Sequence, residues 1–423
     1  MKKIINLLAV FVLAVASLFS LTSVSAQEKV KVTFWHAMNG PHQEAITELV
    51  KQFNESQDQY EVVEQNQGEY DTLNQKVLGA VVSNELPTMS QLTPSNITDY
   101  AGEGILTPLD DLLTDENGFS QALMDDIYPG FMAGVKMDDQ IYAIPFSKSV
   151  RLMFVNKDLL DKAGVEVPKT WDEVKALGDA LKEAGVDKPA MGLENGFSME
   201  LETMARQNGA TWIAEDLSST DIASDKAVEP MQFLKDLIDQ GYARTAGEDG
   251  YMSGPFSQGE SALYIGSSAG IPYVLPGVEE SGMTLETAEI PVYGEGEALT
   301  LFAGNDLGIF ESATDEEKAG AVAFMAYLLE ADNTATWATK SGYLPITKSG
   351  TDSEIWKKYL EENPYVEAAT KELEYGQSQV PYVGSGEVFN ELNTVIEDIV
   401  LNDADVKESL QSIEDLVKGH LGL

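Results

Sequence analysis

The stretch that decides the fold is VKVTFWHAMNGPHQEAITELVKQFN, residues 30–54. Apolar side chains alternate at its start, which predicts a short strand with one buried face. Asn39, Gly40 and Pro41 then indicate a turn. The apolar residues after this turn follow helical spacing, at Ile46, Leu49, Val50 and Phe53. Strand, turn and helix in this order predict the start of a βαβ unit.

The next segments continue the alternation. Residues 60–66, YEVVEQN, predict a second strand, and residues 88–93, TMSQLT, predict a third. Between them, residues 70–87 predict a helix that stops before Pro87, with one apolar face made of Leu73, Val77, Ala80 and Val81. A βαβαβ order favours an α/β fold with a mostly parallel sheet and helices on both faces.

The later sequence repeats these signals. Residues 140–160 predict a long extended segment, and the last 35 residues predict two short amphipathic helices with a first apolar stripe at Leu392, Ile396, Ile399 and Val400. Thr170 with Glu173, and Thr314 with Glu317, have the spacing of capping boxes at helix starts. No repeat or flexible linker separates two halves, so we expect the chain to cross between domains several times.

The N-terminus has the features of a secretory signal. Residues 1–26 begin with Lys2 and Lys3, continue through an apolar stretch and end at Ala26. The alternative is a membrane anchor, but the apolar stretch is marginal in length and leads directly into a small-residue cleavage site. We therefore predict export to the periplasm or the outer face of the cell. The chain has no cysteine, which predicts no disulfide, no thiolate metal site and no lipoprotein anchor.

Length and charge limit the possible functions. The chain has 423 residues, and the roughly 400 that follow the signal suit two domains of ordinary size. The formal net charge is −43, whereas a nucleic-acid-binding protein needs a basic surface. Long-range electrostatics also do not favour an anionic ligand. The composition thus excludes nucleic acid as a partner.

Enzyme motifs are not found in suitable contexts. No nucleophile elbow, zinc-protease helix, phosphate-binding loop or dinucleotide-binding motif stands between the elements that it requires. His36 and His42 are separated by a Gly-Pro turn, which is not the spacing of metal ligands on a helix. The adjacent Asp110 and Asp111 are not distinctive among 70 acidic residues. The sequence predicts no catalytic residue, no metal and no cofactor.

Nine motifs occur in an order and spacing that resemble one family. They are TFWHAMNG (33–40), FNESQDQYEVV (53–63), QGEYDTLNQKV (67–77), IPFSKSVRLMFVNKDLLDKAG (144–164), PKTWDEV (168–174), FSQGESALYIGSSAG (256–270), AGNDLGIF (303–310), SGYLPITKS (341–349) and EENPYVEAA (361–369). Together they resemble the extracellular solute-binding proteins of carbohydrate-type ABC importers, in the branch that binds glycerol-3-phosphate.

The resemblance implies a type II periplasmic-binding-protein-like fold. Its two α/β lobes would be joined by a hinge and close on a ligand, with lobe I at 27–148 and 302–331, and lobe II at 149–301 and 332–423. It implies a monomer that captures a small carbohydrate or polyol-phosphate-like ligand and delivers it to permease subunits. Two alternatives stay open: a ligand-presenting sensor of the same fold, and a secreted glycoside-active enzyme.

The resemblance also implies where the ligand binds. It assigns five ligand-binding residues, at the positions Tyr70, Ser149, Ser267, Gly304 and Tyr343. Hydroxyls and backbone N–H groups can satisfy the hydroxyls of a polyol, and aromatic faces can stack on its C–H surface. Trp35 and His36 end the first predicted strand, so we expect them at the cleft edge as ligand-binding residues that shape its wall or donate one hydrogen bond. We expect His42, at the helix start, at the surface.

Three departures from the family pattern bear on the ligand. The acidic residue expected after the third strand is missing near Pro94, residues 375–392 contain no Arg or Lys, and only Phe197 stands where the second lobe should carry an aromatic pair. Phosphate recognition usually depends on an Arg fork or a helix N-terminus. The departures point to a neutral sugar, an oligosaccharide or a glycerophosphodiester, although Lys148 or Arg151 could still hold an anion.

Overall fold

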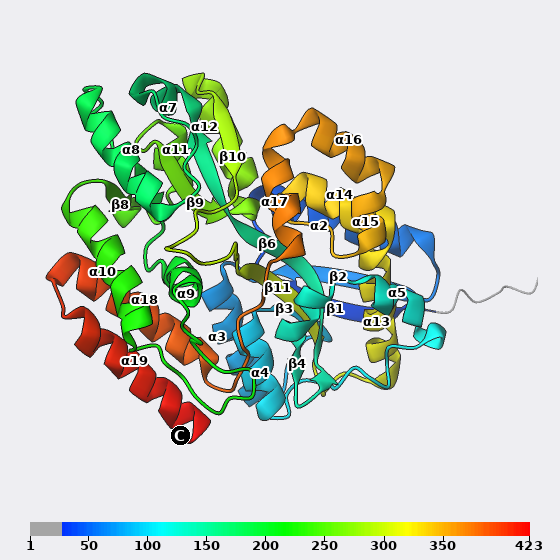
Figure 1. The fold of residues 1–423 in the computed structure, drawn as a ribbon. Helices are drawn as coiled ribbons and strands as arrows, with labels where there is room; N and C mark the ends of the chain where they lie inside the picture. Colours follow the sequence, from blue (N-terminus) through cyan, green and yellow to red (C-terminus); the bar gives the residue numbers. More distant parts are fainter. Residues whose placement is uncertain (1–27) are drawn as a thin grey trace, which may run out of the picture.

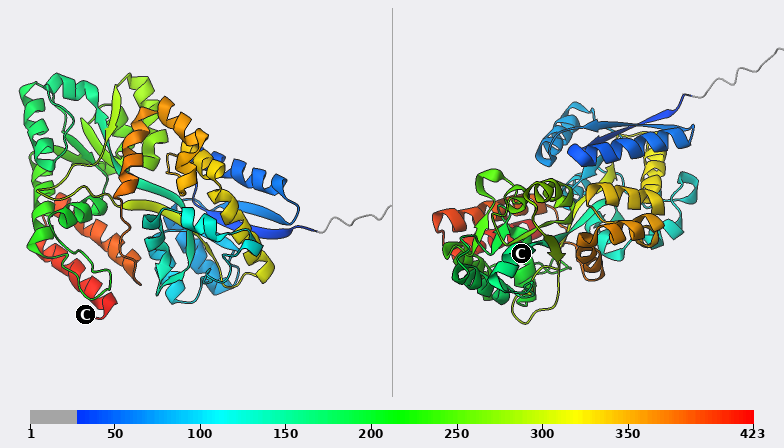
Figure 2. Two further views of the ribbon diagram at one scale, coloured as in Figure 1. Left: turned by 45° about the vertical axis from the view of Figure 1, so that its right-hand side comes forward. Right: turned by 90° about the horizontal axis from the view of Figure 1, so that it is seen from above.

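The protein forms two α/β lobes that are joined by long strands (Figure 1, Figure 2). The structure is a computed structural model that describes residues 28–423, so the predicted signal at 1–26 lies outside the described residues. A single mixed sheet of nine strands runs through both lobes, in the order β2-β1-β3-β11-β6-β9-β7-β8, with β10 paired to β6. One hydrophobic cluster extends from the first lobe into the second, and another lies within the second lobe.

The first lobe contains the predicted βαβαβ unit. Strand β1 (Val30–His36) pairs in parallel with β2 (Tyr60–Asn66) and with β3 (Met89–Leu92). The alternating residues Val32 and Phe34 are fully buried, which explains why the sequence pattern predicted this strand. The predictions for residues 30–93 are confirmed.

Long strands connect the lobes. All residues of β6 (Ala143–Asn156) are buried. Its first half pairs antiparallel with β11 (Phe302–Ile309), and its second half pairs antiparallel with β9 (Leu263–Ser267) and β10 (Leu285–Ala288).

The sheet is therefore mixed, and the expectation of a mostly parallel sheet is wrong. Parallel pairing holds within each lobe, between β1, β2 and β3 and between β7 (Met191–Leu193), β8 (Ala243–Thr245) and β9. The strands that join the lobes run antiparallel, because β11 enters between β3 and β6 in the opposite direction. A separate hairpin is made by β4 (Lys136–Met137) and β5 (Gln140–Ile141).

Helices cover both faces of the first lobe. They are α2 (Gly40–Ser56), α3 (Tyr70–Ser83), α4 (Pro94–Gly102), α5 (Gln121–Asp126), α6 (Pro129–Met132) and α13 (Asp315–Leu329). The predicted face of α2 is buried, and Phe53 packs against Phe324 of α13 with ring centroids 5.1 Å apart. The predicted capping box of Thr314 and Glu317 begins α13.

The second lobe is more helical. Its helices are α7 (Lys157–Ala163), α8 (Trp171–Glu183), α9 (Ser198–Gln207), α10 (Asp225–Asp239), α11 (Ser253–Ser257), α12 (Ile271–Ser281), α18 (Ser385–Asn402) and α19 (Val406–Leu421). The capping box of Thr170 and Glu173 begins α8 as predicted. The two C-terminal helices are also confirmed, although with 18 and 16 residues they are longer than expected.

Four helices follow α13 along the chain, namely α14 (Ala331–Ser341), α15 (Lys348–Asp352), α16 (Glu354–Glu362) and α17 (Glu367–Lys371). Helix α14 lies beside α2 of the first lobe (Figure 1). Its Trp337 stacks on Phe146, with ring centroids 4.9 Å apart. The lobe boundary predicted between residues 331 and 332 stays a prediction, and this packing favours a later boundary.

Short 3₁₀ turns complete the chain, at Asp115–Asn117, Ala133–Val135, Gly247–Asp249, Ser268–Gly270, Pro364–Val366 and Glu372–Glu374. Within residues 28–423, no helix combines the length and the apolar composition that crossing a bilayer requires.

Candidate functional site

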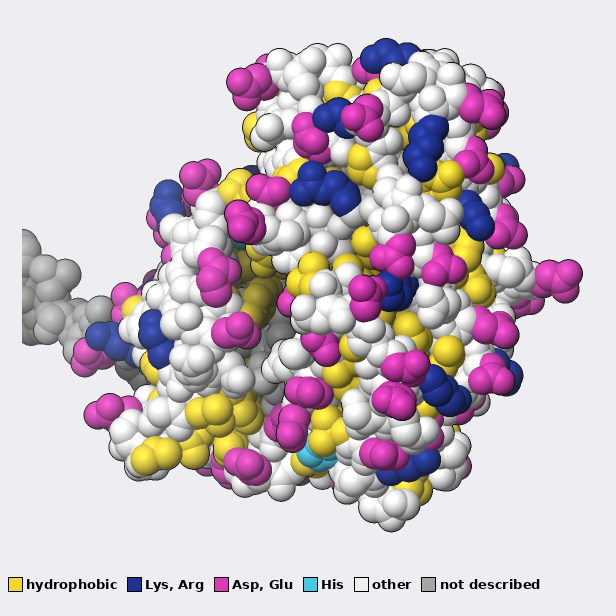
Figure 3. Space-filling model, turned by 90° about the vertical axis from the view of Figure 1, so that its left-hand side faces the viewer, with side chains coloured by type: hydrophobic (Ala, Val, Ile, Leu, Met, Phe, Trp, Pro, Cys, Tyr) yellow, Lys and Arg dark blue, Asp and Glu magenta, His cyan; other side chains and the backbone are white. Residues whose placement is uncertain are grey.

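A hollow separates the two lobes on one face of the molecule, with hydrophobic side chains visible inside it (Figure 3). Tyrosines from both lobes come close to one another where the lobes meet. Tyr70 begins α3 in the first lobe, whereas Tyr273 belongs to α12 in the second. The Tyr273 hydroxyl lies 3.4 Å from the Asn39 carbonyl oxygen across the hollow. Tyr251 of the second lobe is 71% exposed, and its pKa is raised by burial of the hydroxyl and by nearby Glu69 of the first lobe.

Tyr343 is held rigidly at this hollow. Its ring stacks on Trp337, with centroids 5.8 Å apart and an interplanar angle of 11°. Gly342 before it has φ +73°, and a Cβ there would lie 2.8 Å from the Ser268 carbonyl oxygen. Only glycine fits this left-handed turn so close to another backbone. The turn therefore fixes where the Tyr343 side chain points.

His42 is buried against the same turn, so the prediction of a surface position is wrong. The residue is 8% exposed, and its Nε2 lies 2.7 Å from the Ser341 carbonyl oxygen. The ring also contacts Tyr343, with centroids 5.2 Å apart. Burial lowers the pKa of His42, although the bond to Ser341 opposes this shift. The start of α2 thus supports the turn that carries Tyr343, a contact that no local pattern predicts.

Tyr70 and Tyr343, which are distant in sequence, come together in space. The Tyr70 oxygen accepts a hydrogen bond of 2.6 Å from the Asn305 amide Nδ2. Burial raises the pKa of Tyr70 well above its usual value, and the neighbouring Tyr343 hydroxyl raises it further. Tyr70 as a residue is 36% exposed, so part of it is open to solvent.

Gly304 lies in β11, directly before Asn305. Its φ is +109°, and a Cβ would lie 1.8 Å from the Ser147 carbonyl oxygen, so only glycine fits here. The register of β11 against β6 shifts between Asn305 and Asp306. Such an irregularity changes the direction in which a strand aims its side chains. The structure thus gives Gly304 a backbone role and points to Asn305, which the sequence prediction omitted.

Ser149 and Ser267 are brought together by the pairing of β6 with β9. The Ser267 hydroxyl donates to the Ser149 hydroxyl at 2.9 Å. Ser267 also accepts the Ala269 N–H at 3.1 Å, which caps the short turn that follows β9. Ser149 is 1% exposed, whereas Ser267 is partly open. The two hydroxyls form one polar spot at the end of β9.

The polar atoms of Trp35 and His36 form hydrogen bonds with strand β2 and with the backbone that follows β1. The indole N–H of Trp35 donates to Gln65 Oε1 at 2.8 Å. His36 is fully buried, with its Nε2 at 3.2 Å from Glu64 Oε2 and its Nδ1 accepting the Met38 N–H. These contacts occupy the polar atoms of both side chains. Neither side chain forms a hydrogen bond or a ring contact with Tyr70, Asn305 or Tyr343.

The two cations that could hold an anion are already paired. Lys148 Nζ lies 2.6 Å from Asp306 Oδ1, and both residues are almost completely buried. Arg151 Nε lies 2.6 Å from Glu200 Oε1, again with both residues buried. Burial raises the pKa of Asp306 to about 6, because desolvation outweighs the attraction of Lys148. Neither cation is free to neutralise a phosphate.

The second lobe adds an acidic group near Tyr251. Glu194 follows β7 and accepts hydrogen bonds from the Tyr264 hydroxyl and from the Met252 N–H. Burial raises the pKa of Glu194, although these bonds oppose the shift. Glu194 and Glu69 both raise the pKa of Tyr251. The wall is therefore aromatic and acidic.

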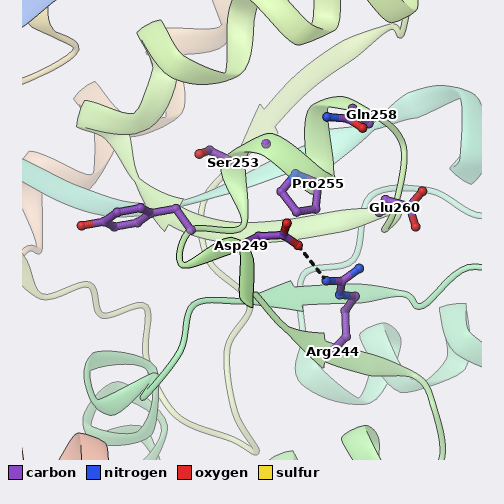
Figure 4. A pocket seen from close by; sticks show the side chains of 8 residues that line it. Arg244, Asp249, Ser253, Pro255, Gln258 and Glu260 are labelled. Carbon is purple, nitrogen blue, oxygen red and sulfur yellow. Dashed lines mark hydrogen bonds and ion pairs between the residues drawn. The ribbon is translucent and has the colours of Figure 1, made fainter. Parts of the chain in front are cut away.

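A shallow pocket lies beside this wall, between β8 and α11 (Figure 4). Arg244 is its only cation among the lining residues, and its Nη2 lies 3.4 Å from Asp249 Oδ2. This arginine is therefore also paired. Among residues 28–423, no group of three or more metal-ligating side chains is placed to hold a metal ion.

A sequence profile and several curated proteins match the chain. The profile described as bacterial extracellular solute-binding protein matches residues 48–363. The sn-glycerol-3-phosphate-binding periplasmic protein UgpB of Rhizobium meliloti is 30% identical over 352 residues, which cover 80% of either chain. Its namesake from Brucella melitensis is 28% identical over 400 residues, covering 90% of this chain and 91% of the relative.

Solved structures share the fold. UgpB from Mycobacterium tuberculosis, in complex with glycerophosphocholine, superposes with a TM-score of 0.82 at 23% identity, covering 93% of this chain and 98% of that one. The cyclic α-maltosyl-1,6-maltose binding protein of Arthrobacter globiformis gives a TM-score of 0.79, also at 23% identity, covering 93% and 99%. These likenesses establish the two-lobed fold that the sequence predicted.

Proposed function

This chain belongs to the bacterial extracellular solute-binding proteins, and from that premise we propose that its interlobe hollow takes an uncharged or zwitterionic solute. It is the solute-binding component of an ABC importer, as the resemblance implied. The ligand class that fits best is a carbohydrate or a glycerophosphodiester with a cationic head group, and free glycerol-3-phosphate fits less well.

The pairing of Lys148 and Arg151 with buried carboxylates is the observation that carries this proposal. A phosphate monoester brings up to two negative charges, which need a charge-assisted partner when they are desolvated. Taking Lys148 or Arg151 for this purpose would leave Asp306 or Glu200 buried without its partner. A neutral or zwitterionic ligand does not require this exchange.

The remaining groups at the hollow suit a hydroxyl-rich or zwitterionic solute. Tyr251 and Tyr273 are 71% and 46% exposed, so their faces are open to stack on apolar C–H surface. Ser267 and Tyr343 offer hydroxyls for hydrogen bonds. Glu69 and Glu194 beside Tyr251 disfavour a free anion. The solved neighbours named for glycerophosphocholine and for a maltosyl sugar support these two ligand classes.

We further infer that the two lobes close on the ligand. The predicted lobes, 27–148 with 302–331 and 149–301 with 332–423, meet near the junction of β6 and β11. The packing of α14 on the first lobe supports moving part of 332–423 there. Closure by a ligand requires tighter binding to the closed form than to the open one.

We also infer that binding is not followed by catalysis and that neither a metal nor another cofactor takes part. The relatives are named as binding proteins, and three acidic groups near the hollow have partners: Asp306 with Lys148, Glu200 with Arg151, and Glu194 with Tyr264. We also propose that the protein is a monomer that is held outside the cytoplasm without a lipid anchor, as the sequence predicted.

Thermal unfolding with a ligand panel tests the ligand class. The panel contains glycerophosphocholine, maltose and glycerol-3-phosphate, each up to millimolar concentration. A ligand at about 100 times its Kd stabilises the folded protein by roughly 2.7 kcal/mol. We expect a shift with glycerophosphocholine or with maltose. A shift with glycerol-3-phosphate alone would overturn the proposal, and conversion of maltose, followed by NMR, would overturn the absence of catalysis.

A further inference from the structure

Helix α9 lies near the centre of the molecule (Figure 1), and most of its residues are buried although many of them are polar. Its apolar residues pack into the hydrophobic cluster of the second lobe, namely Leu201, Met204 and Ala205. Glu200, Glu202 and Gln207 are buried as well. Polar side chains at such depth need hydrogen-bond partners, so the partners of these three residues show what the helix holds.

Three segments join the lobes beside this helix, and we call them the joining segments. The first is β6, which pairs with β11 in its first half and with β9 in its second. The second, residues 289–301, leads from β10 to β11. The third, residues 375–384, leads into α18 of the second lobe but also touches the first lobe, where Ser378 Oγ donates to the Gly130 carbonyl oxygen at 2.9 Å.

Glu200 holds the first joining segment. Its Oε1 lies 2.6 Å from Nε of Arg151 in the second half of β6. The backbone of Arg151 is bonded to Thr300 of the second joining segment: its N–H donates to Thr300 Oγ1 at 3.2 Å, and this hydroxyl donates to the Arg151 carbonyl oxygen at 3.3 Å. The ion pair of α9 with β6 is therefore connected to the second joining segment as well.

Gln207 holds the second joining segment directly. Its Oε1 accepts the Tyr293 N–H at 2.9 Å, and its Nε2 donates to the Glu297 carbonyl oxygen at 3.3 Å. The chain passes very close here, because a Cβ on Gly296 would lie 2.5 Å from the Gln207 carbonyl oxygen. One side-chain amide thus fixes two points of this segment to the end of α9.

Glu202 and Arg206 hold the third joining segment. Gln379 Nε2 donates to Glu202 Oε2 at 2.6 Å, and the Arg206 guanidinium donates to the side-chain oxygen of Gln377. Ser378, between these two glutamines, bonds to the first lobe instead. Side chains of an extended chain point alternately to opposite sides, so this segment is bonded to α9 on one side and to the first lobe on the other.

The joining segments are also bonded to one another. The Gln377 N–H donates to the Thr300 carbonyl oxygen at 3.0 Å, and the Phe302 N–H donates to the Gln377 carbonyl oxygen at 2.8 Å. The pairing becomes irregular just beyond this point, on the side of the first lobe. The register of β11 against β6 shifts after Asn305, and Gly304 has φ +109°. An interrupted ladder of this kind is where a strand bends.

We propose that α9 is a positioning helix that fixes the three joining segments to the second lobe, so that the lobes bend at the irregular pairing around Gly304. Ser378 then gives way before Gln379 does, because a hydrogen bond to a buried carboxylate is stronger than one between a hydroxyl and a carbonyl. The inference rests on the proposed function for closure of the lobes on a ligand. A protein held in this way has few lobe arrangements to lose when it closes.

Gln207→Ala tests the role of α9 without any ligand. It removes both bonds to the second joining segment, which should then move relative to the second lobe. The chain has no cysteine, so Lys51→Cys on α2 and Lys175→Cys on α8, both exposed, can carry one spin label in each lobe. Double electron–electron resonance then measures the distances between the labels. We expect a broader distribution of distances in Gln207→Ala than in the labelled protein without this change.

Asn54→Ala is the matched control. Asn54 makes the same two kinds of bond inside the first lobe, because its Oδ1 accepts the Val62 N–H at 2.8 Å and its Nδ2 donates to the Val62 carbonyl oxygen at 2.9 Å. We expect this variant to melt at a lower temperature, as Gln207→Ala does, but to keep the original distance distribution. An unchanged distribution in Gln207→Ala, or equal broadening in both variants, would overturn the proposal.

Gln379→Ala serves as a second variant if Gln207→Ala does not fold. Gln379 is only partly buried, and its loss frees the third joining segment from Glu202. We expect the distance distribution to broaden here too. A distribution as narrow as that of the control Asn54→Ala would contradict the role of α9 in holding this segment.

Binding adds a readout that separates this inference from the ligand class. By calorimetric titration we expect Gln207→Ala to bind glycerophosphocholine or maltose, whichever binds, about 2- to 10-fold more weakly than the control, because the ligand must fix a looser pair of lobes. Unchanged affinity together with a broadened distribution would overturn the link to closure. If neither compound binds, the proposed ligand class is wrong, while the spin-label distances still decide the role of α9.

Discussion

Two polar side chains lie next to each other on strand β11, and their polar atoms have different kinds of partner. Asn305 belongs to a neutral chain of amides and hydroxyls, whereas Asp306, the next residue, forms an ion pair with Lys148. The ion pair neutralises itself and offers nothing to a ligand. The neutral chain runs from the Gln91 amide through Asn305 to the Tyr70 hydroxyl, and it contains no charged group. The difference supports our proposal that this protein recognises its ligand by directed hydrogen bonds and not by net charge.

Breaking the other buried ion pair should have the largest effect. Glu200→Leu leaves Arg151 buried without its partner, which should lower the free energy of unfolding by about 3–5 kcal/mol. Urea unfolding of the ligand-free protein measures this loss. The double variant Arg151→Met with Glu200→Leu should recover much of it, because no unpaired charge remains. Equal losses in both variants would show that packing, and not charge pairing, matters here.

The next effect depends on pH and concerns Asp306. Burial raises its pKa to about 6, with Lys148 offsetting part of the shift. The ordinary pKa of an aspartate in an unfolded chain is about 3.9, so the folded protein keeps a proton that the unfolded chain has lost. Stability should therefore fall by up to about 3 kcal/mol as pH rises from about 4 through 6.

Asp306→Asn removes this titration. The unfolding free energy of the variant, measured by urea from about pH 4 to 7, should decline less with pH than that of the wild type. Parallel curves would contradict the assignment of this slope to Asp306. The variant also leaves Lys148 without its carboxylate, so it should bind glycerol-3-phosphate better than the wild type. That gain would confirm that pairing keeps Lys148 from anions.

Tyr343→Phe tests how much a neutral hydroxyl contributes to ligand binding, in contrast to the ion pairs above. The ring keeps its stacking on Trp337, but the hydroxyl is lost. We expect binding to weaken by about 1–3 kcal/mol, measured by calorimetric titration with the panel ligand that binds. The melting temperature of the ligand-free protein should change little. A variant that melts several degrees lower yet binds normally would show that this hydroxyl supports packing alone.

The smallest effect is expected at Ser267. Ser267→Ala removes a hydroxyl that donates to Ser149 and accepts from Ala269, both of which are neutral partners. A typical hydrogen bond of this kind contributes about 0.5–1.5 kcal/mol. We expect the loss to be shared between binding and stability, because Ser267 also caps the turn after β9. A loss of binding that exceeds that of Tyr343→Phe would reverse the ranking proposed here.

The sequence showed part of the site but missed its central residues. Tyr70, Ser149, Ser267, Gly304 and Tyr343 came from the family resemblance, and their role in ligand binding stays a prediction. Gln91 and Asn305 were missed, because each is one polar residue within a strand. A polar amide inside the buried segment MSQL is a signal that can be noticed, but it does not reveal the partner.

By itself, the sequence determined the local elements. Apolar residues with a period of two or of 3.6 mark the strand β1 and the helix α2, and capping boxes mark the starts of α8 and α13. These signals depend on neighbours a few residues apart, so they can be read without the fold.

Only the tertiary structure decided how these elements meet. It placed β11 antiparallel between β3 and β6, buried His42 under the turn of Tyr343, and paired Lys148 with Asp306. Periodicity shows that a face is buried, but it carries no information about which distant residue covers it. The contacts that orient Tyr70 join segments more than 50 residues apart, and for that reason they exist only once the chain has folded.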